Sequence, residues 1–309
     1  MPLFDAKKCA EEIFNSPLRK ILEDYDRRIR RWLTVGMVII IIGICCFAFL
    51  EIPYPFFIMM LGALIAGFSN QNRRSYFRKI IIPELFKHAL PSLKYRPESG
   101  ISRTKFLSYG LYNNFDCYDS EDKISGTIGK TAFTGAEVHL RNEHSGKDGK
   151  KTYTTVFRGV VFVADFNKHL KSRTVVLPDI AERCFGKLIG NFFQKMNFFD
   201  GSSVKLENPE FEKLFSVYSH DQIEARYILT PKMMENLTAL RTKKNTDMRL
   251  VFEDDHVAIA ISKPSGWLEP PSFGKFARVE VLENILIELE EVLNIIEDLD
   301  LNTRIWTKQ

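Results

Sequence analysis

Motifs built from cysteine or histidine are missing from this chain of 309 residues. The five cysteines form no CxxC pair, and the six histidines form no HExxH motif. These absences exclude a locally encoded zinc site and argue against a disulfide framework. The odd number of cysteines, two of them inside an apolar stretch, fits a reducing compartment. We therefore expect no metal site and no cofactor.

Local catalytic motifs are missing as well. No GxSxG elbow occurs, and Gly129-Lys130-Thr131 imitates a phosphate-binding loop whose first glycine is replaced by Ile124. One acidic cluster lacks the glycine and the alternation of a calcium loop, and we interpret it as a solvated turn: Asp116, Asp119, Glu121 and Asp122. A non-enzyme is therefore favoured, although catalytic groups can also converge from distant positions.

No strong charge of one sign dominates the chain. The net charge is +4 and the pI is near 8.7, so the balance does not suggest a nucleic-acid partner. Charge is nevertheless segregated. Residues 71–96 carry seven basic side chains and one acidic side chain, whereas residues 276–301 carry eight acids and one arginine.

Charged side chains are absent from two apolar stretches, residues 33–50 and 52–69. Each has about the length of a helix that crosses a hydrocarbon core, and a turn over residues 51–55 with two prolines breaks the apolar run. The sequence therefore predicts a transmembrane helical hairpin. Two alternatives remain open at this point, a buried helical pair in a soluble protein and a hairpin that enters one leaflet without crossing.

Basic residues flank this pair of stretches, and the turn between them has none. Because cytoplasmic flanks of membrane spans are enriched in arginine and lysine, both termini are expected in the cytoplasm. The second flank is also a candidate membrane surface that would attract anionic headgroups, or would only fix the topology: Arg73, Arg74, Arg78 and Lys79. Three aromatic residues stand where headgroups are expected: Trp32, Tyr54 and Tyr76.

Outside the hairpin, the pattern predicts an α+β protein. Residues 5–31 read as an amphipathic helix broken at Asn15-Ser16, and residues 83–90 as a short helix between prolines. Residues 94–178 read mostly as strand, with one helix expected around residues 102–109 and capped by Ser102. Shorter helices and strands follow, including a helix over residues 231–243 capped by Thr230 and a hairpin formed by residues 248–252 and 256–261. Because strands come first and do not alternate regularly with helices, a doubly wound sheet is disfavoured.

The C-terminal region predicts one long helix with a heptad seam. Apolar residues spaced by three and four form this seam: Val279, Leu282, Leu286, Leu289, Leu293 and Ile296. Further apolar residues broaden the stripe beyond what a two-stranded coiled coil requires. Packing on the chain's own domain is therefore favoured over a protein partner or a second copy, and both remain open.

These elements divide the chain into five predicted parts: a cytoplasmic arm (1–32), the hairpin (33–69), a basic linker helix (70–92), the α+β domain (93–270), and the C-terminal helix and tail (271–309).

Three segments resemble a bacterial family classed as a domain of unknown function: residues 155–179, 204–241 and 299–309, with the strings FRG, ADFNK, VVLPD and EARYILTP. The resemblance implies a two-span protein of the bacterial inner membrane with a cytoplasmic domain. It supplies no activity and no catalytic residue.

The residues themselves favour a membrane-anchored binding or scaffold protein. A membrane-associated enzyme is the alternative, and a lipid-binding or pore-forming assembly is a third. The polar residues of the family-like strings are candidates for a pocket, although turns and helix caps also explain them: Arg158, Asp165, Asn167, Asp179, Glu224 and Arg226.

Overall fold

The computed structural model describes residues 5–49, 55–146, 149–166, 168–179, 202–244, 246–270 and 275–299. The chain forms two compact units. One comprises Met1–Pro91 with Leu268–Glu291, and the other comprises Ser92–Trp267 with Val292–Gln309. We call them the helical unit and the sheet unit.

The helical unit begins with two helices, α1 (Ala6–Phe14) and α2 (Leu18–Phe49). Asp5 caps α1 by accepting a hydrogen bond from the Lys8 amide at 3.0 Å. The chain breaks at Asn15-Ser16 before Pro17, as predicted. The amphipathic arm and the first apolar stretch then form one continuous helix, α2.

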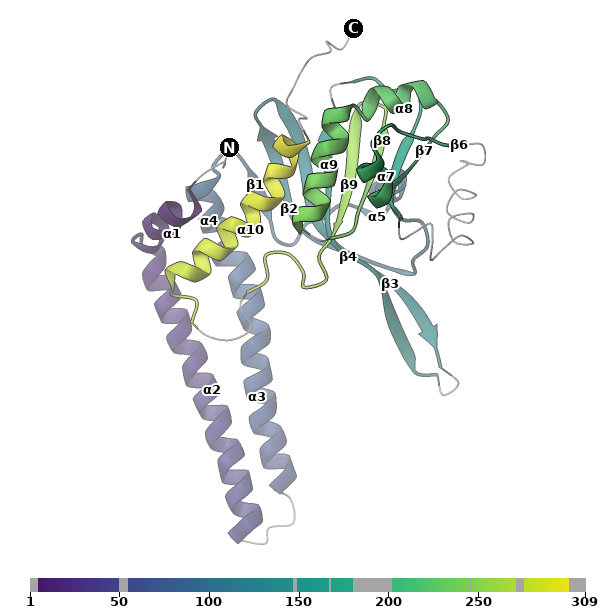
Figure 1. The fold of residues 1–309 in the computed structure, drawn as a ribbon. Helices are drawn as coiled ribbons and strands as arrows, with labels where there is room; N and C mark the ends of the chain where they lie inside the picture. The colour runs from purple at the N-terminus through teal and green to yellow at the C-terminus, as the bar shows by residue number, and fades with distance from the viewer. Residues whose placement is uncertain are drawn as a thin grey trace. The chain divides into compact units, whose positions relative to one another are not determined.

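A second run of helix comprises α3 (Pro55–Tyr76), the π-helical turn η1 (Phe77–Ile81) and α4 (Ile82–Ala89). Figure 1 shows α2 and α3 side by side. They approach closely at Gly62, where an added Cβ would lie 2.7 Å from Ile40 Cγ1 and 2.8 Å from the Gly36 carbonyl oxygen. A small residue at this position therefore allows the close approach.

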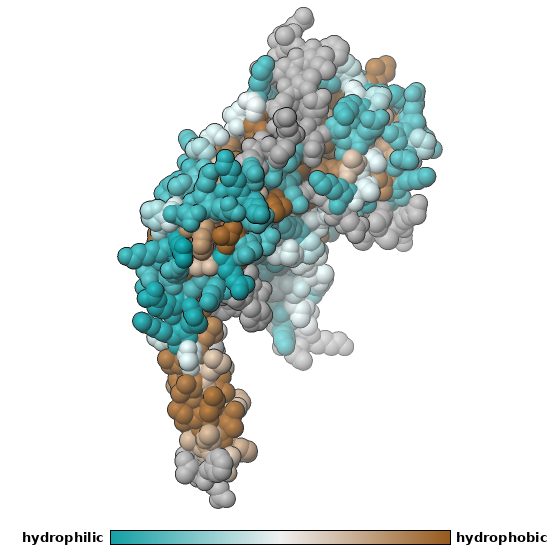
Figure 2. All heavy atoms as spheres, turned by 60° about the vertical axis from the view of Figure 1, so that its left-hand side comes forward, coloured by the Kyte–Doolittle hydropathy of each residue, from teal (hydrophilic) through white to brown (hydrophobic). Residues whose placement is uncertain are grey.

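Apolar side chains cover the outside of this helix pair instead of being buried by it. Leu18–Ala48 is the one described helix long and apolar enough to cross a membrane, and only 11% of its most apolar window is buried. Figure 2 shows the resulting brown surface bordered by hydrophilic residues. The second predicted span is not supported in this form, because the described apolar part of α3, Phe56–Ile65, is shorter than a membrane span.

The sheet unit contains an antiparallel nine-stranded sheet in the order β1-β2-β3-β4-β9-β8-β5-β7-β6. The prediction of α+β structure is confirmed. The strands are β1 (Lys94–Arg96), β2 (Cys117–Ile128), β3 (Thr131–Ser145), β4 (Lys151–Asp165), β5 (Thr174–Pro178), β6 (Ser202–Ser203), β7 (Phe215–Ser219), β8 (Met248–Glu253) and β9 (His256–Ser262).

Four short helices accompany the described strands: α5 (Arg103–Ser108), α7 (Pro209–Leu214), α8 (Gln222–Ile228) and α9 (Pro231–Lys244). Local capping sets their starts. The Ser102 hydroxyl accepts from the Lys105 amide, and Thr230 Oγ1 accepts from the Met233 amide, as the sequence predicted. Phe106 of α5 belongs to a buried cluster that includes Val138 and Val161 of the sheet.

The acidic segment 116–122 was wrongly interpreted as a solvated turn. Most of it forms the first half of β2, paired with β3. Asp119 accepts from Arg141 on the neighbouring strand at 2.6 Å, and Asp116 Oδ2 accepts from the Glu143 amide. Cross-strand partners therefore compensate for a composition that disfavours strand.

The C-terminal helix is α10 (Val279–Asp298). Its seam residues Leu282, Leu286, Leu289 and Leu293 are at most 1% exposed within the chain, and Val279 is half-buried. The side chain of Ile296 lies outside the described residues. The coiled-coil interpretation is not supported, because the chain's own residues bury the stripe.

Candidate functional site

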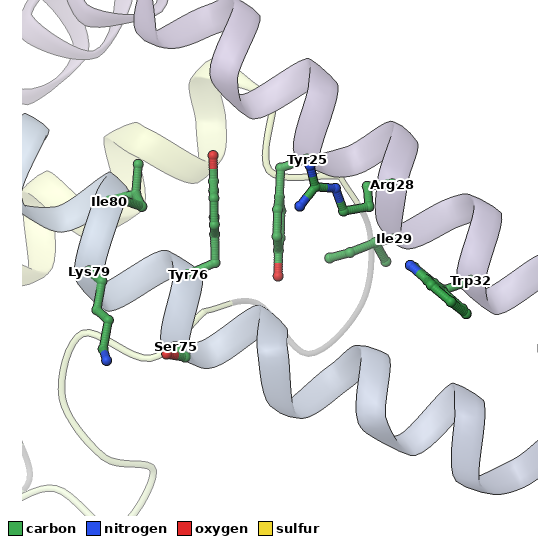
Figure 3. A pocket seen from close by; sticks show the side chains of 8 residues that line it. All are labelled: Tyr25, Arg28, Ile29, Trp32, Ser75, Tyr76, Lys79 and Ile80. Atoms are coloured by element: carbon green, nitrogen blue, oxygen red, sulfur yellow. The ribbon is translucent and has the colours of Figure 1, made fainter.

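A cavity of about 450 Å³ opens in the helical unit where α2 approaches the junction of α3 and η1. Four of its lining residues come from α2 and four from the α3–η1 run: Tyr25, Arg28, Ile29, Trp32, Ser75, Tyr76, Lys79 and Ile80. Figure 3 shows these side chains between the two helices. Its volume lies within the range of small-molecule sites.

Two stacked tyrosines line this cavity. The rings of Tyr25 and Tyr76 stack with centroids 3.8 Å apart and an angle of 4° between their planes. Figure 3 shows the two rings standing parallel, one from each helix. Because each ring has few degrees of freedom and contacts the other, the pair makes a rigid wall.

Phe276 supports this wall from the segment that leads into α10. Its ring lies 5.7 Å from Tyr25 and 5.4 Å from Phe77, measured between centroids. The Asp26 carboxylate, 5% exposed, accepts from the backbone amides of Phe276 and Ala277, each at 2.9 Å. A charge-assisted pair of hydrogen bonds therefore fixes the residue behind the tyrosines.

Two cations lie at the cavity, Arg28 from α2 and Lys79 from η1. Both side chains are exposed. Burial raises the pKa of the Tyr76 phenol above its usual value, and the positive charge of Arg28 opposes that rise. Tyr76 is therefore a neutral hydrogen-bonding group at physiological pH, beside a permanent positive charge.

The cavity lies at the boundary between the charged and the apolar part of α2. Trp32, 53% exposed, is the last lining residue on this helix, and the apolar stretch without charged residues begins at Leu33. Further along α2, Val35, Met37 and Val38 are also exposed. Aromatic side chains at such boundaries are typical of the headgroup region of a membrane.

The predicted membrane-surface residues occupy different environments. Arg74 forms a salt bridge of 2.6 Å with Glu269, and Arg78 is only 7% exposed. Lys79 lines the cavity. The side chain of Arg73 lies outside the described residues. The three described side chains therefore lie in different environments, and Lys79 alone of these three lines the cavity.

The predicted pocket residues Arg158 and Asp165 both lie on β4, seven residues apart. At about 3.3 Å per residue, this separation is about 23 Å along the strand. Arg158 Nε donates to Glu137 Oε1 at 3.2 Å, and Asp165 pairs with His256 in the β4–β9 register. The structure does not bring these two residues together.

Glu224 and Arg226 lie on α8 and hold loops in place. Glu224 accepts from the backbone amides of Lys171 and Ser172 at 3.0 and 2.8 Å, and Arg226 donates to the Lys205 carbonyl oxygen at 3.2 Å. Asp179 follows β5 directly and is half-buried. Asn167 lies outside the described residues.

A buried acidic centre in the sheet unit escaped the sequence-based prediction. Carboxylate oxygens of Glu121, Asp122 and Glu137 lie within 4.8 Å of one another, a spacing that could hold a cation. Glu137 already accepts from Arg158 and from the Trp267 amide, the latter at 3.0 Å. Tyr95 donates to Asp122 at 2.5 Å. These contacts are consistent with a structural centre.

Several residues that line the cavity had sequence features of their own, but none of these features indicated a cavity. Trp32 and Tyr76 were expected near headgroups, and Lys79 was a candidate surface cation. Arg28 is one of the basic residues that precede the first apolar stretch. Only the packing of α2 against α3 brings them together. For the acidic centre, Glu121 and Asp122 stood out as part of an acidic cluster. Glu137 gave no signal, because it lies in an alternating strand and its partner Trp267 is 130 residues away.

Residues 155–301 match a family described as protein of unknown function (DUF3137). The predicted resemblance to a domain of unknown function is therefore supported for this part of the chain, whereas a two-span membrane family is not. No match was found among curated proteins. One similar solved structure is the mycobacterial trehalose monomycolate transport factor A, at 10% identity and a TM-score of 0.31. The match covers 66% of this chain and 88% of that one.

Proposed function

We propose that this protein is a membrane-anchored binding protein whose sheet unit lies on the cytoplasmic side. The exposed apolar surface of α2 is the observation that carries the proposal. The most apolar 18-residue segment of this helix has a mean hydropathy of 2.2, yet only 11% of that segment is buried within the chain. A core helix of a soluble protein would bury such side chains, whereas a hydrocarbon environment accepts them.

The finer topology that we propose is a hairpin with α2 and α3 both inside the bilayer. Exposed apolar residues continue on α3, including Phe56, Phe57 and Leu64. Arginines at both outer flanks, and none in the intervening turn, favour cytoplasmic termini. Because the apolar part of α3 is short, shallow insertion of this helix is the competing arrangement.

Binding is favoured over catalysis by the roles of the polar residues in the sheet unit. Glu224 caps loop amides, and Glu137 pairs with Arg158 and a backbone amide. Arg173 pairs with Glu253. Each of these groups already serves a structural contact, which supports an adaptor role over an enzyme.

The anchoring is tested by membrane fractionation and by tag accessibility. Full-length protein should stay in the membrane pellet after an alkaline carbonate wash. Tags at the N-terminus and after residue 69 should be reached only from the cytoplasmic side, and a tag inserted at Pro53 only from the outside. Release by carbonate would overturn the anchoring, whereas a protected tag at Pro53 would support shallow insertion.

A further inference from the structure

The cavity between α2 and the α3–η1 run lies at headgroup depth if α2 enters the bilayer as proposed above. Ile29 and Trp32 line it on the side where the exposed apolar surface of α2 begins. A ligand in this cavity would therefore contact water-facing and lipid-facing side chains at once. An amphiphile satisfies both, whereas a free anion satisfies only the polar part.

The charge of the cavity selects an anion. Arg28 and Lys79 come from different helices and both line the cavity. Figure 3 shows them on either side of the tyrosine pair. A guanidinium donates two parallel hydrogen bonds to phosphate oxygens, and an ammonium adds a compact positive charge.

The rest of the lining fits a phosphate ester with an apolar extension. Ser75 and Tyr76 supply hydroxyl groups, and Ile29 and Ile80 supply apolar surface. The stacked tyrosines and Phe276 give this lining a fixed shape before any ligand binds. Preorganised walls reduce the entropy lost on binding.

We propose that this cavity binds the phosphate headgroup of an anionic phospholipid, with Arg28 and Lys79 supplying the positive charge of the cavity and Trp32 beside the start of the acyl chains. The proposal rests on the membrane anchoring proposed above. Such a site makes the anchor selective for anionic lipids, whereas a plain apolar helix would not distinguish lipids by headgroup charge.

The test uses the full chain in a neutral detergent, titrated with dioctanoyl phosphatidylglycerol, dioctanoyl phosphatidylcholine or inorganic phosphate. Binding is read by intrinsic fluorescence, to which Trp32 at the cavity contributes, and by the shift in Tm. We expect saturable binding of phosphatidylglycerol. We expect at least tenfold weaker responses to phosphatidylcholine and to inorganic phosphate, because the first lacks net charge and the second lacks the apolar part.

Two variants probe the cavity in different ways. Arg28→Gln with Lys79→Gln removes both cations and should weaken phosphatidylglycerol binding at least tenfold. Ser75→Trp keeps both cations and fills the cavity, and should weaken binding to a similar degree. The matched control is Arg27→Gln with Arg31→Gln, which removes two exposed cations of α2 that do not line the cavity and should change binding less than twofold.

The outcomes separate this proposal from the anchoring itself. Unchanged binding in both cavity variants, or equal loss in the control, would overturn the headgroup site. Equal affinity for inorganic phosphate would assign the site to a free anion and overturn the lipid. Flotation with neutral phosphatidylcholine vesicles tests anchoring alone. It should be retained in every variant, and its absence in the unmodified chain would overturn the anchoring.

Discussion

Two long helices of this protein, α2 and α10, bury their apolar residues to opposite degrees. In α2, residues such as Val38, Ile41 and Ile44 are about half exposed. In α10, Leu286 and Leu293 are fully buried. The difference follows from sequence pattern. Glutamates interrupt α10 so that its apolar residues form one stripe, whereas no charge interrupts the apolar half of α2.

Helix length and hydrophobicity alone therefore do not indicate whether lipid or protein surrounds a helix. An apolar stripe on a helix with a polar opposite face needs a protein surface to cover it. In α10, other residues of the same chain cover the stripe. A helix apolar on all sides has no face that prefers water. Substitutions in one helix at a time can distinguish a lipid environment from a protein environment.

The largest effect is expected from charges in the middle of α2. Ile41→Lys with Ile44→Lys should remove the protein from the carbonate-resistant membrane fraction, because each lysine at the centre of a span costs about 2.5–3.5 kcal/mol of insertion free energy. Ile41→Leu with Ile44→Leu is the matched control and should stay in the membrane. Equal retention of both variants would show that α2 does not cross the hydrocarbon core.

The local part of the fold could be predicted from sequence because short-range signals encode it. Pro17 marked the break between α1 and α2, and Ser102 and Thr230 marked helix starts that the structure confirms. The alternation of β8 and β9 predicted their pairing across residues 253–255. Caps, turns and periodicity act within a few residues, so a single sequence contains them.

Contacts between distant residues could not be predicted in this way. The strand at Asp119 depends on Arg141 of the neighbouring strand. The cavity depends on Tyr25 meeting Tyr76, and on Asp26 holding the amide of Phe276, which is 250 residues away. Each residue has an adequate local explanation, so nothing in its neighbourhood reveals the long-range partner.

An intermediate effect is expected from charges in the buried stripe of α10. Leu286→Asp with Leu293→Asp should destabilise the full chain in detergent by about 5 kcal/mol or more, because each change removes a buried side chain and buries a carboxylate. Thermal unfolding and limited proteolysis measure this loss.

The control for α10 is Ile287→Asp on the same helix, where the side chain is 39% exposed. This variant should lower Tm by only a few degrees. If the double variant instead kept its Tm and lost only an oligomeric form, the stripe would serve a partner. That result would contradict the internal packing and would make α10 resemble α2 in needing an external surface.

The smallest effect is expected where α2 and α3 touch each other, because most of their surface faces outward. Both Gly62 and Gly67 lie on α3 within a pattern of small residues spaced four apart, a pattern that allows close helix packing. The structure separates them. A Cβ on Gly62 would meet Ile40 Cγ1 at 2.7 Å and backbone oxygen of Gly36 at 2.8 Å, whereas a Cβ on Gly67 would meet nothing within 4 Å.

Gly62→Leu should therefore force the helices apart and cost about 1–3 kcal/mol, as overpacking does elsewhere. Gly67→Leu adds the same side chain to the same helix and should leave stability unchanged or slightly raised, since glycine is a poor helix former. Tm in detergent and cross-linking between cysteines placed on α2 and α3 distinguish the two variants. Equal behaviour would show that α2 and α3 do not approach each other closely at Gly62. A selective loss in Gly62→Leu would show that this contact holds α2 against α3.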